Sequence, residues 1–209
     1  MESVSHPLFA RFYTRLVVPA IARSGGAELR RRVVAGLAGA VVEVGAGDGA
    51  SFEHYPAEVR RIVAVEPEPY LRERAAAAAA DDSRVELRDG LASRLPVEDG
   101  SVDAVVFSLV LCSVDQAEAL AEARRVLRPG GELRFLEHVQ AQRPGAMRRL
   151  QQLLDATVWP RLFGGCHCGR DTVGAIERAG FTITELDRFA FPEGARGPEA
   201  AAVLGRAVA

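Results

Sequence analysis

Hydrophobic positions along this chain alternate between short β-branched runs and longer stretches with helical spacing. Runs such as Val41–Val44 and Ile62–Val65 are continuous and apolar, which is typical of strands buried on both faces. Because these runs alternate with helical segments, the pattern predicts an α/β domain built on a parallel sheet. The expected strands cover residues 41–44, 61–66, 84–88, 104–109, 132–139, 181–189 and 200–208.

Helical periodicity and capping residues predict the intervening helices. Prolines 67 and 69 start one helix that continues into an alanine run, and Asp171 begins another. The helix over 115–127 is expected to end at the glycine stop of residues 128–131. Further helices are expected over 50–55, 146–159 and 171–179, the second ending at Pro160.

The first expected strand ends in a turn with glycines at alternate positions, Gly45, Gly47 and Gly49. Glycine lets the backbone turn tightly and lets bare N–H groups approach a ligand. The second strand ends in Glu66, about twenty residues after the glycines, a spacing that suits a carboxylate accepting ribose hydroxyls. The alternative interpretation is an ordinary glycine-rich turn between strand and helix.

Two further acids indicate the kind of cofactor. A dinucleotide site could be formed loosely by Gly45, Gly47 and Ala50. However, Glu43 in the strand and Asp48 in the turn would repel a pyrophosphate. They suit a cofactor that carries an ammonium and a sulfonium.

Length, composition and charge restrict the function further. The 209 residues fit one domain with a full core, and 48% hydrophobic residues are ordinary for a globular protein. A net charge of −2 gives no electrostatic footprint for nucleic acid. Three cysteines form no disulfide framework, and we see no signal peptide or membrane span, so we expect a cytoplasmic protein.

Several motifs together resemble a known family. They are E-V-G-A-G-D-G at 43–49, L-V-L-C-S-V at 109–114, R-R-V-L-R-P-G-G at 124–131 and E-H-V at 137–139. The first resembles class I S-adenosylmethionine (SAM) methyltransferases, and the set resembles the ubiquinone- and menaquinone-type superfamily. The match looks closer still to the alkyl-thiol methyltransferases of the methyltransferase-like family, whose eukaryotic members carry an N-terminal membrane anchor that this chain is expected to lack.

The resemblance implies a fold and a domain organisation. The fold is a Rossmann-like, seven-stranded, mostly parallel sheet whose antiparallel last strand lies between the fifth and sixth, with helices on both faces. Residues 38–209 would form the SAM-binding domain, and the helical segment 1–37 would cover the cofactor cleft. Within that segment Phe9, Phe12 and Tyr13 recur at helical spacing, as core residues or as part of the substrate pocket.

The resemblance also implies the residues that bind SAM and, as product, S-adenosylhomocysteine. The backbone of the glycine turn would run close to the methionine moiety, Glu66 would accept the ribose hydroxyls, and Ser108 would flank the reaction centre. Leu91 stands where many members have a polar residue, so Asp89 or the Ala92 backbone would serve the adenine amino group. The full set is Glu43, Gly45, Ala46, Gly47, Gly49, Glu66, Pro67, Asp89, Gly90, Leu91, Ala92, Ser108 and Leu109.

Two histidines are candidates on the acceptor side. His138 ends the fifth strand, where ligands gather, and is either a general base or a structural histidine. His167 lies in a Gly-Cys-His-Cys-Gly loop that could cap the acceptor pocket. Cys166, His167 and Cys168 with His138 invite a metal interpretation, but the paired C-x-x-C units of structural zinc are missing. We therefore expect no metal.

The sequence favours a methyltransferase acting on a small molecule, with a thiol as the expected acceptor. O- or C-methylation of a hydroxylated or quinone-like compound stays open. An NAD-dependent oxidoreductase would need a Tyr/Lys or comparable apparatus, and the chain contains no lysine. A non-catalytic SAM-binding protein is the third class. The acceptor and the oligomeric state do not follow from the sequence.

Overall fold

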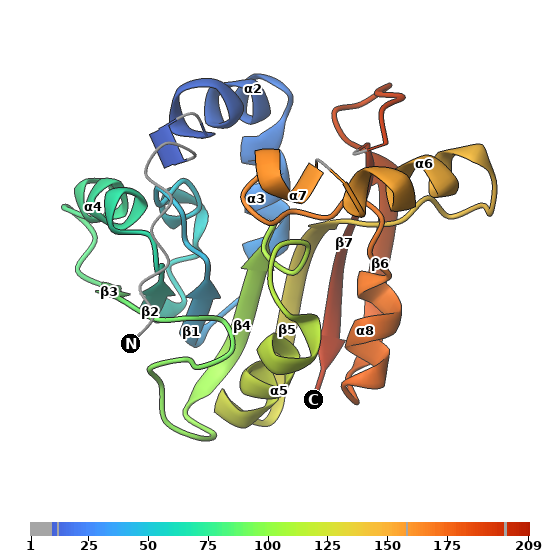
Figure 1. Ribbon diagram of the computed structural model, residues 1–209. Helices are drawn as coiled ribbons and strands as arrows, with labels where there is room; N and C mark the ends of the chain where they lie inside the picture. The colour runs from blue at the N-terminus through green and yellow to red at the C-terminus, as the bar shows by residue number, and fades with distance from the viewer. Residues whose placement is uncertain (1–9, 12, 158, 199) are drawn as a thin grey trace.

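The computed structural model describes residues 10–209 except 12, 158 and 199. A seven-stranded sheet forms the middle layer (Figure 1). Helices α5 and α8 contact each other over one face, and α3 packs on the other face against β4, β5 and β7. The strands are β1 (Gly39–Val44), β2 (Val59–Val65), β3 (Val85–Arg88), β4 (Val102–Ser108), β5 (Leu127–His138), β6 (Thr182–Ala190) and β7 (Ala201–Val208).

The strand order is β3-β2-β1-β4-β5-β7-β6. Strand β7 pairs antiparallel with both of its neighbours, and the pairs from β3 to β5 are parallel. The predicted fold class, including the position and direction of the last strand, is confirmed. The chain leaves β1 toward β2 and β3 and then returns to place β4 on the other side of β1. Such a reversal opens a crevice at the carboxyl ends of the strands.

The two faces of the sheet bury separate apolar clusters. Phe107 and Phe135 pack with Leu120 of α5 and Ile176 of α8 on one face. Val33 of α3 lies in the other cluster with residues of β1, β2 and β4. The central strands are covered on both faces, which is why their sequences are continuous apolar runs.

The helices are α2 (Val18–Arg23), α3 (Gly26–Val34), α4 (Pro69–Ala78), α5 (Gln116–Val126), α6 (Ala146–Asp155), α7 (Trp159–Leu162) and α8 (Thr172–Arg178), with a π-helical turn η1 (Tyr13–Val17) and a 3-10 turn η2 (Phe52–His54). The caps of α4, α5 and α8 are Glu68, Asp115 and Asp171, whose side chains accept backbone N–H groups. In the described part of the chain, no helix is both long and apolar enough to cross a bilayer.

Three helix predictions were wrong in their bounds. Only η2 forms within 50–55. Helix α5 ends at Val126 because Leu127 already pairs with Val102 of β4, so the expected glycine stop lies inside β5. Helix α6 ends at Asp155, and Pro160 stands in the first turn of α7, where a missing N–H costs nothing.

The N-terminal segment is helical from Tyr13 onward, as expected. Phe9 and Phe12, two of the predicted pocket or core aromatics, lie outside the described residues, and so does the side chain of Tyr13. Leu29 and Val33 of α3 are buried against the domain.

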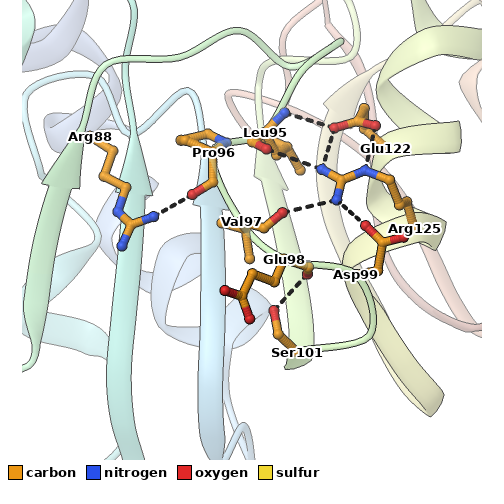
Figure 2. Close-up of polar contacts among 9 residues, drawn as sticks. All are labelled: Arg88, Leu95, Pro96, Val97, Glu98, Asp99, Ser101, Glu122 and Arg125. Atoms are coloured by element: carbon orange, nitrogen blue, oxygen red, sulfur yellow. Dashed lines mark hydrogen bonds and ion pairs between the residues drawn. The ribbon is translucent and has the colours of Figure 1, made fainter.

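The segment that leads into β4 is held by Arg125 of α5 (Figure 2). Its guanidinium donates to the carbonyls of Leu95 and Val97 at 3.1 and 2.9 Å, and pairs with Glu122 and Asp99 at 2.7 and 2.6 Å. One planar fork thereby fixes the loop at several points. This contact fixes the amino end of β4, opposite to the ligand edge of the sheet.

Candidate functional site

A cavity of about 750 Å³ opens at the carboxyl ends of the strands. Its volume falls in the range typical of small-molecule sites, about 300–1,000 Å³. It lies at the reversal between β1 and β4, where α/β sheets bind ligands. The residues at the strand ends that line it are Val44, Gly45, Val65, Glu66, Ser108, Leu109 and His138.

The glycine turn after β1 forms part of the cavity wall. The N–H groups of Gly45 and Ala46 donate to the carbonyl of Val65 at 2.8 and 3.1 Å, which ties the turn to β2. Gly47 has φ +59°, and a Cβ built there would meet no atom within 4 Å. Any side chain at Gly47 would therefore extend into open space at the wall of the cavity.

Gly45 and Gly49 are required for other reasons. A Cβ on Gly45 would come within 2.6 Å of the Val110 side chain, and one on Gly49 within 2.7 Å of the Phe52 ring. Gly45 therefore permits the close approach of the segment that follows β4, and Gly49 permits the packing of η2. Of the predicted turn residues, Gly45 and Gly47 line the cavity, whereas Ala46 and Gly49 do not.

Glu66, directly after β2, is oriented by backbone groups. Its Oε2 accepts the N–H of Gly47 at 2.8 Å and its Oε1 accepts the N–H of Glu68 at 2.9 Å. Only 5% of Glu66 is exposed, and burial raises the pKa of its carboxyl group. Each oxygen keeps acceptor capacity for a further hydrogen bond, so the buried carboxyl can receive two hydroxyls of a ligand.

The segment after β3 supplies another part of the wall. Gly90, Leu91 and Ala92 line the cavity with Pro67, and all four are predicted cofactor-binding residues. Asp89 does not line it, and its carboxylate pairs with Arg72 at 3.3 Å. The adenine contact expected of Asp89 stays a prediction.

Glu43 lies behind the cavity wall. It is 2% exposed, and burial raises its pKa to about 7 against the smaller opposing influence of the neighbouring Ser51 and Tyr55. It does not line the cavity, so the structure brings it near the glycine turn without exposing it to a ligand there.

The turn after β4 carries an unusual backbone. Leu109 has φ +61° and is the one non-glycine residue with positive φ among those described. Its N–H donates to the carbonyl of Leu136 at 2.7 Å. A side chain in this region costs about 1–3 kcal/mol and persists only where neighbours enforce it. Leu109 and Ser108, which are predicted to flank the reaction centre, both line the cavity.

Glu137 supplies that enforcement, and its role was missed in the sequence analysis. It is fully buried, and its carboxyl group accepts the N–H groups of Val110, Leu111 and Cys112 at 2.8, 2.9 and 3.3 Å. Burial raises its pKa to about 7. The available signal was an acid inside an apolar strand, since such a group is buried only with partners.

The other end of the cavity is apolar and comes from later segments. Trp159 and Phe163 stack with ring centroids 4.3 Å apart, and both line the cavity with His138, the last residue of β5. Leu16 and Ile21 from the N-terminal helices also line the cavity.

His167 does not line the cavity. Its ring Nδ1 lies 2.8 Å from the carbonyl oxygen of Gly165, and its backbone N–H donates to the carbonyl of Cys112 at 2.8 Å. The two predicted acceptor-side histidines are therefore not equivalent. Among the described residues, no group of three or more His, Cys, Asp or Glu side chains is arranged to hold a metal ion.

The sequence of the chain is similar to those of known methyltransferases. Residues 42–135 match the family model described as a methyltransferase domain. The chain is 38% identical over 157 residues to human thiol S-methyltransferase TMT1A, an alignment that covers 73% of this chain and 64% of that protein. The chain thus spans less than two thirds of that relative's length.

Solved structures share the fold. A geranyl diphosphate methyltransferase in complex with SAM superposes with a TM-score of 0.72 at 17% identity, over 91% of this chain and 88% of that one. The [4+2]-cyclase SpnF gives a TM-score of 0.70 at 18% identity, over 90% and 81% of the two chains. Because a cyclase shares this fold, the fold alone does not determine the reaction.

Proposed function

Because the chain belongs to the class I SAM-dependent methyltransferases, we propose that it moves a methyl group from SAM to a small apolar molecule, and that the acceptor atom is a thiol sulfur. The observation that carries the proposal is one continuous cavity with two different ends. The buried carboxyl of Glu66 and the open face of Gly47 lie at one end, and the stacked rings of Trp159 and Phe163 lie at the other.

The first end fits the cofactor. Glu66 accepts the ribose hydroxyls, and the absent side chain of Gly47 leaves room for the methionine part. Gly90, Leu91 and Ala92 provide a largely apolar surface for the adenine, with backbone groups in place of a polar side chain. When bound, SAM supplies a methyl group on a positively charged sulfur and leaves as S-adenosylhomocysteine.

The second end selects the acceptor. Its lining includes the aromatic rings of Trp159 and Phe163, so it favours an uncharged acceptor with a hydrocarbon body. The similarity to a thiol S-methyltransferase supports sulfur as the nucleophile. Free cysteine thiols support a reducing compartment such as the cytoplasm as the place of action.

Positioning contributes most to such a displacement, because the transfer needs little covalent assistance. Ser108 and the strained turn at Leu109 border the reaction centre, and Glu137 keeps that turn in place. His138 removes the thiol proton as general base. His167 acts on acceptor binding through the loop that it helps to shape.

We also propose that residues 1–37 form a cover over the cleft. Leu16, Ile21 and Ser24 reach the cavity from the N-terminal helices, while Leu29 and Val33 anchor α3 on the domain. A cover of this kind would exclude water from the reaction centre.

Calorimetric titration with SAM, S-adenosylhomocysteine and NAD tests the cofactor assignment. SAM and S-adenosylhomocysteine should bind with a stoichiometry near one per chain, and NAD should not bind. Preferential binding of NAD would overturn the assignment. In a second titration, a small aliphatic thiol or a phenol is added to the chain saturated with S-adenosylhomocysteine. Binding of the thiol and not the phenol would support the proposed thiol acceptor over a hydroxylated one.

A further inference from the structure

Two thiols meet in the wall of the acceptor end of the cavity. Cys112, in the turn after β4, and Cys166, in the loop after α7, have their Sγ atoms 3.5 Å apart, and both residues line the cavity. They are 54 residues apart in the chain. Both are free thiols.

The backbone ties the two segments together beside the thiols. The N–H of His167 donates to the carbonyl of Cys112 at 2.8 Å. A disulfide joins its sulfur atoms at about 2.03–2.05 Å, so the two Sγ atoms, which lie 3.5 Å apart, must approach by about 1.5 Å.

The two thiols differ in reactivity. Cys112 is 1% exposed and lies beside the Glu137 carboxyl, whereas Cys166 is half-buried. Contact with the Cys112 thiol lowers the pKa of Cys166, and the same contact together with burial raises the pKa of Cys112. Cys166 is therefore the thiol that ionises first and attacks, since the thiolate is the nucleophile.

The third cysteine, Cys168, also lines the cavity, and its thiol contacts a carboxylate. The Cys168 thiol lies 3.4 Å from Oδ1 of Asp155, whose same oxygen accepts the Cys168 N–H at 2.8 Å. Burial and this carboxylate raise the pKa of Cys168 to about 12. Cys168 thus supplies a matched internal control.

We infer that Cys112 and Cys166 form a redox-active dithiol that small apolar disulfides, the oxidised form of the acceptor class, convert to an intramolecular disulfide. The inference rests on the proposed function only for the identity of the disulfide, which enters where the thiol acceptor binds. The oxidised pair links the turn after β4 covalently to the loop after α7 in the wall of the cavity.

The exchange balances as two displacements. The Cys166 thiolate attacks one sulfur of the disulfide RSSR, forms a Cys166–SR bond and releases RS⁻. Cys112 then loses its proton and attacks the Cys166 sulfur, which forms the Cys112–Cys166 bond and releases a second RS⁻. The protons of the two cysteines end on the two released thiolates, the cysteines lose two electrons, and RSSR is reduced to two RSH.

The test uses the reduced full chain and diethyl disulfide, a small apolar probe. We expect about two equivalents of ethanethiol per chain, following the balance above. Cys166 and Cys168 share one peptide between Arg161 and Arg170, so peptide mass spectrometry is done on both the wild type and Cys168→Ser. A peptide link from Cys112 should persist in Cys168→Ser at the wild-type rate.

Single variants separate the steps. Cys112→Ala should stop at a lasting mixed disulfide on Cys166, and Cys166→Ser should react at least tenfold more slowly. A disulfide between Cys166 and Cys168 would overturn the inference. So would a wild-type chain that forms mixed disulfides with the probe but no Cys112–Cys166 disulfide. These readouts need no methyl transfer, so they stand or fall separately from the proposed activity.

Discussion

Glu66 accepts the backbone N–H of Gly47 at 2.8 Å, so the carboxyl group after β2 fixes the turn after β1. This contact joins the two sequence features that indicated a nucleotide-type cofactor. It also means that the carboxyl group is both a ligand candidate and a support for the turn. Both roles contribute to the first prediction.

Glu66→Ala should weaken SAM binding by about 10- to 100-fold, because a charged hydrogen bond to the ribose is lost and the Gly47 turn loosens. Calorimetry on the folded variant measures the change. The matched control is Glu53→Ala, which removes a carboxylate that is 81% exposed in η2. Equal affinities in the two variants would remove Glu66 from the cofactor site.

Gly47→Val should abolish SAM binding while the domain stays folded. The side chain would extend into the cavity, and the residue would be held at φ +59°, which costs about 1–2 kcal/mol. Gly100→Val is the control, because Gly100 has φ +55° and equally open surroundings in the loop before β4. Circular dichroism and calorimetry on both variants separate backbone strain from obstruction. Normal affinity in Gly47→Val would show that the turn is only structural.

His138→Ala should lower the rate of methyl transfer to a thiol by about 10²- to 10⁴-fold with SAM affinity intact. The defect should shrink as the pH rises from about 6 to 9, since a thiol with a pKa near 8.5 then ionises by itself. Single-turnover rates over this range decide the point. A defect that does not change with pH would make His138 a structural residue.

His167→Ala should act differently, because its ring contacts Gly165 and does not line the cavity. We expect a higher KM for the acceptor, a smaller change in kcat and no change in SAM affinity. Steady-state kinetics with a small aliphatic thiol measures both constants. A loss confined to kcat would instead assign His167 to the chemical step.

Glu43 should make the stability of the domain depend on pH. Its pKa is raised from 4.5 to about 7 in the folded state, so the folded chain binds more protons than the unfolded chain between these values. Protonated Glu43 therefore contributes its full stabilisation below pH 4.5. As the pH rises through about 7 this contribution is lost, and the free energy of unfolding falls by at most about 3 kcal/mol.

Glu43→Gln removes this titration. The free energy of unfolding of the variant minus that of the wild type should be larger at pH 8 than at pH 5. Urea unfolding of both proteins at the two pH values measures this difference. The same gain at both would show that Glu43 titrates normally in the folded protein.

The sheet and its ligand edge could be predicted because apolar runs and strand ends are local signals. Val41–Val44 and Glu66 needed no tertiary information. The end of α5 could not be placed, because pairing of Leu127 with Val102 outweighs the local glycine stop. The break after Asp155 was missed because Pro160 is also compatible with a new first turn.

The candidate site was predictable on the cofactor side and much less so on the acceptor side. Gly47 and Glu66 belong to a motif with a fixed spacing. Glu137 and the Cys112–Cys166 contact depend on how two loops fold against each other. No periodicity or spacing in the sequence indicates that proximity.

Transfer of an isotopically labelled methyl group tests the central claim most directly. The chain is mixed in excess over methyl-labelled SAM with a small aliphatic thiol, and the labelled product and S-adenosylhomocysteine are quantified over a single turnover. The account predicts a labelled thioether in a one-to-one ratio with S-adenosylhomocysteine, and much slower formation with His138→Ala. SAM that binds tightly in the calorimeter but leaves every thiol and phenol unlabelled would contradict the claim and make the chain a non-catalytic SAM-binding protein.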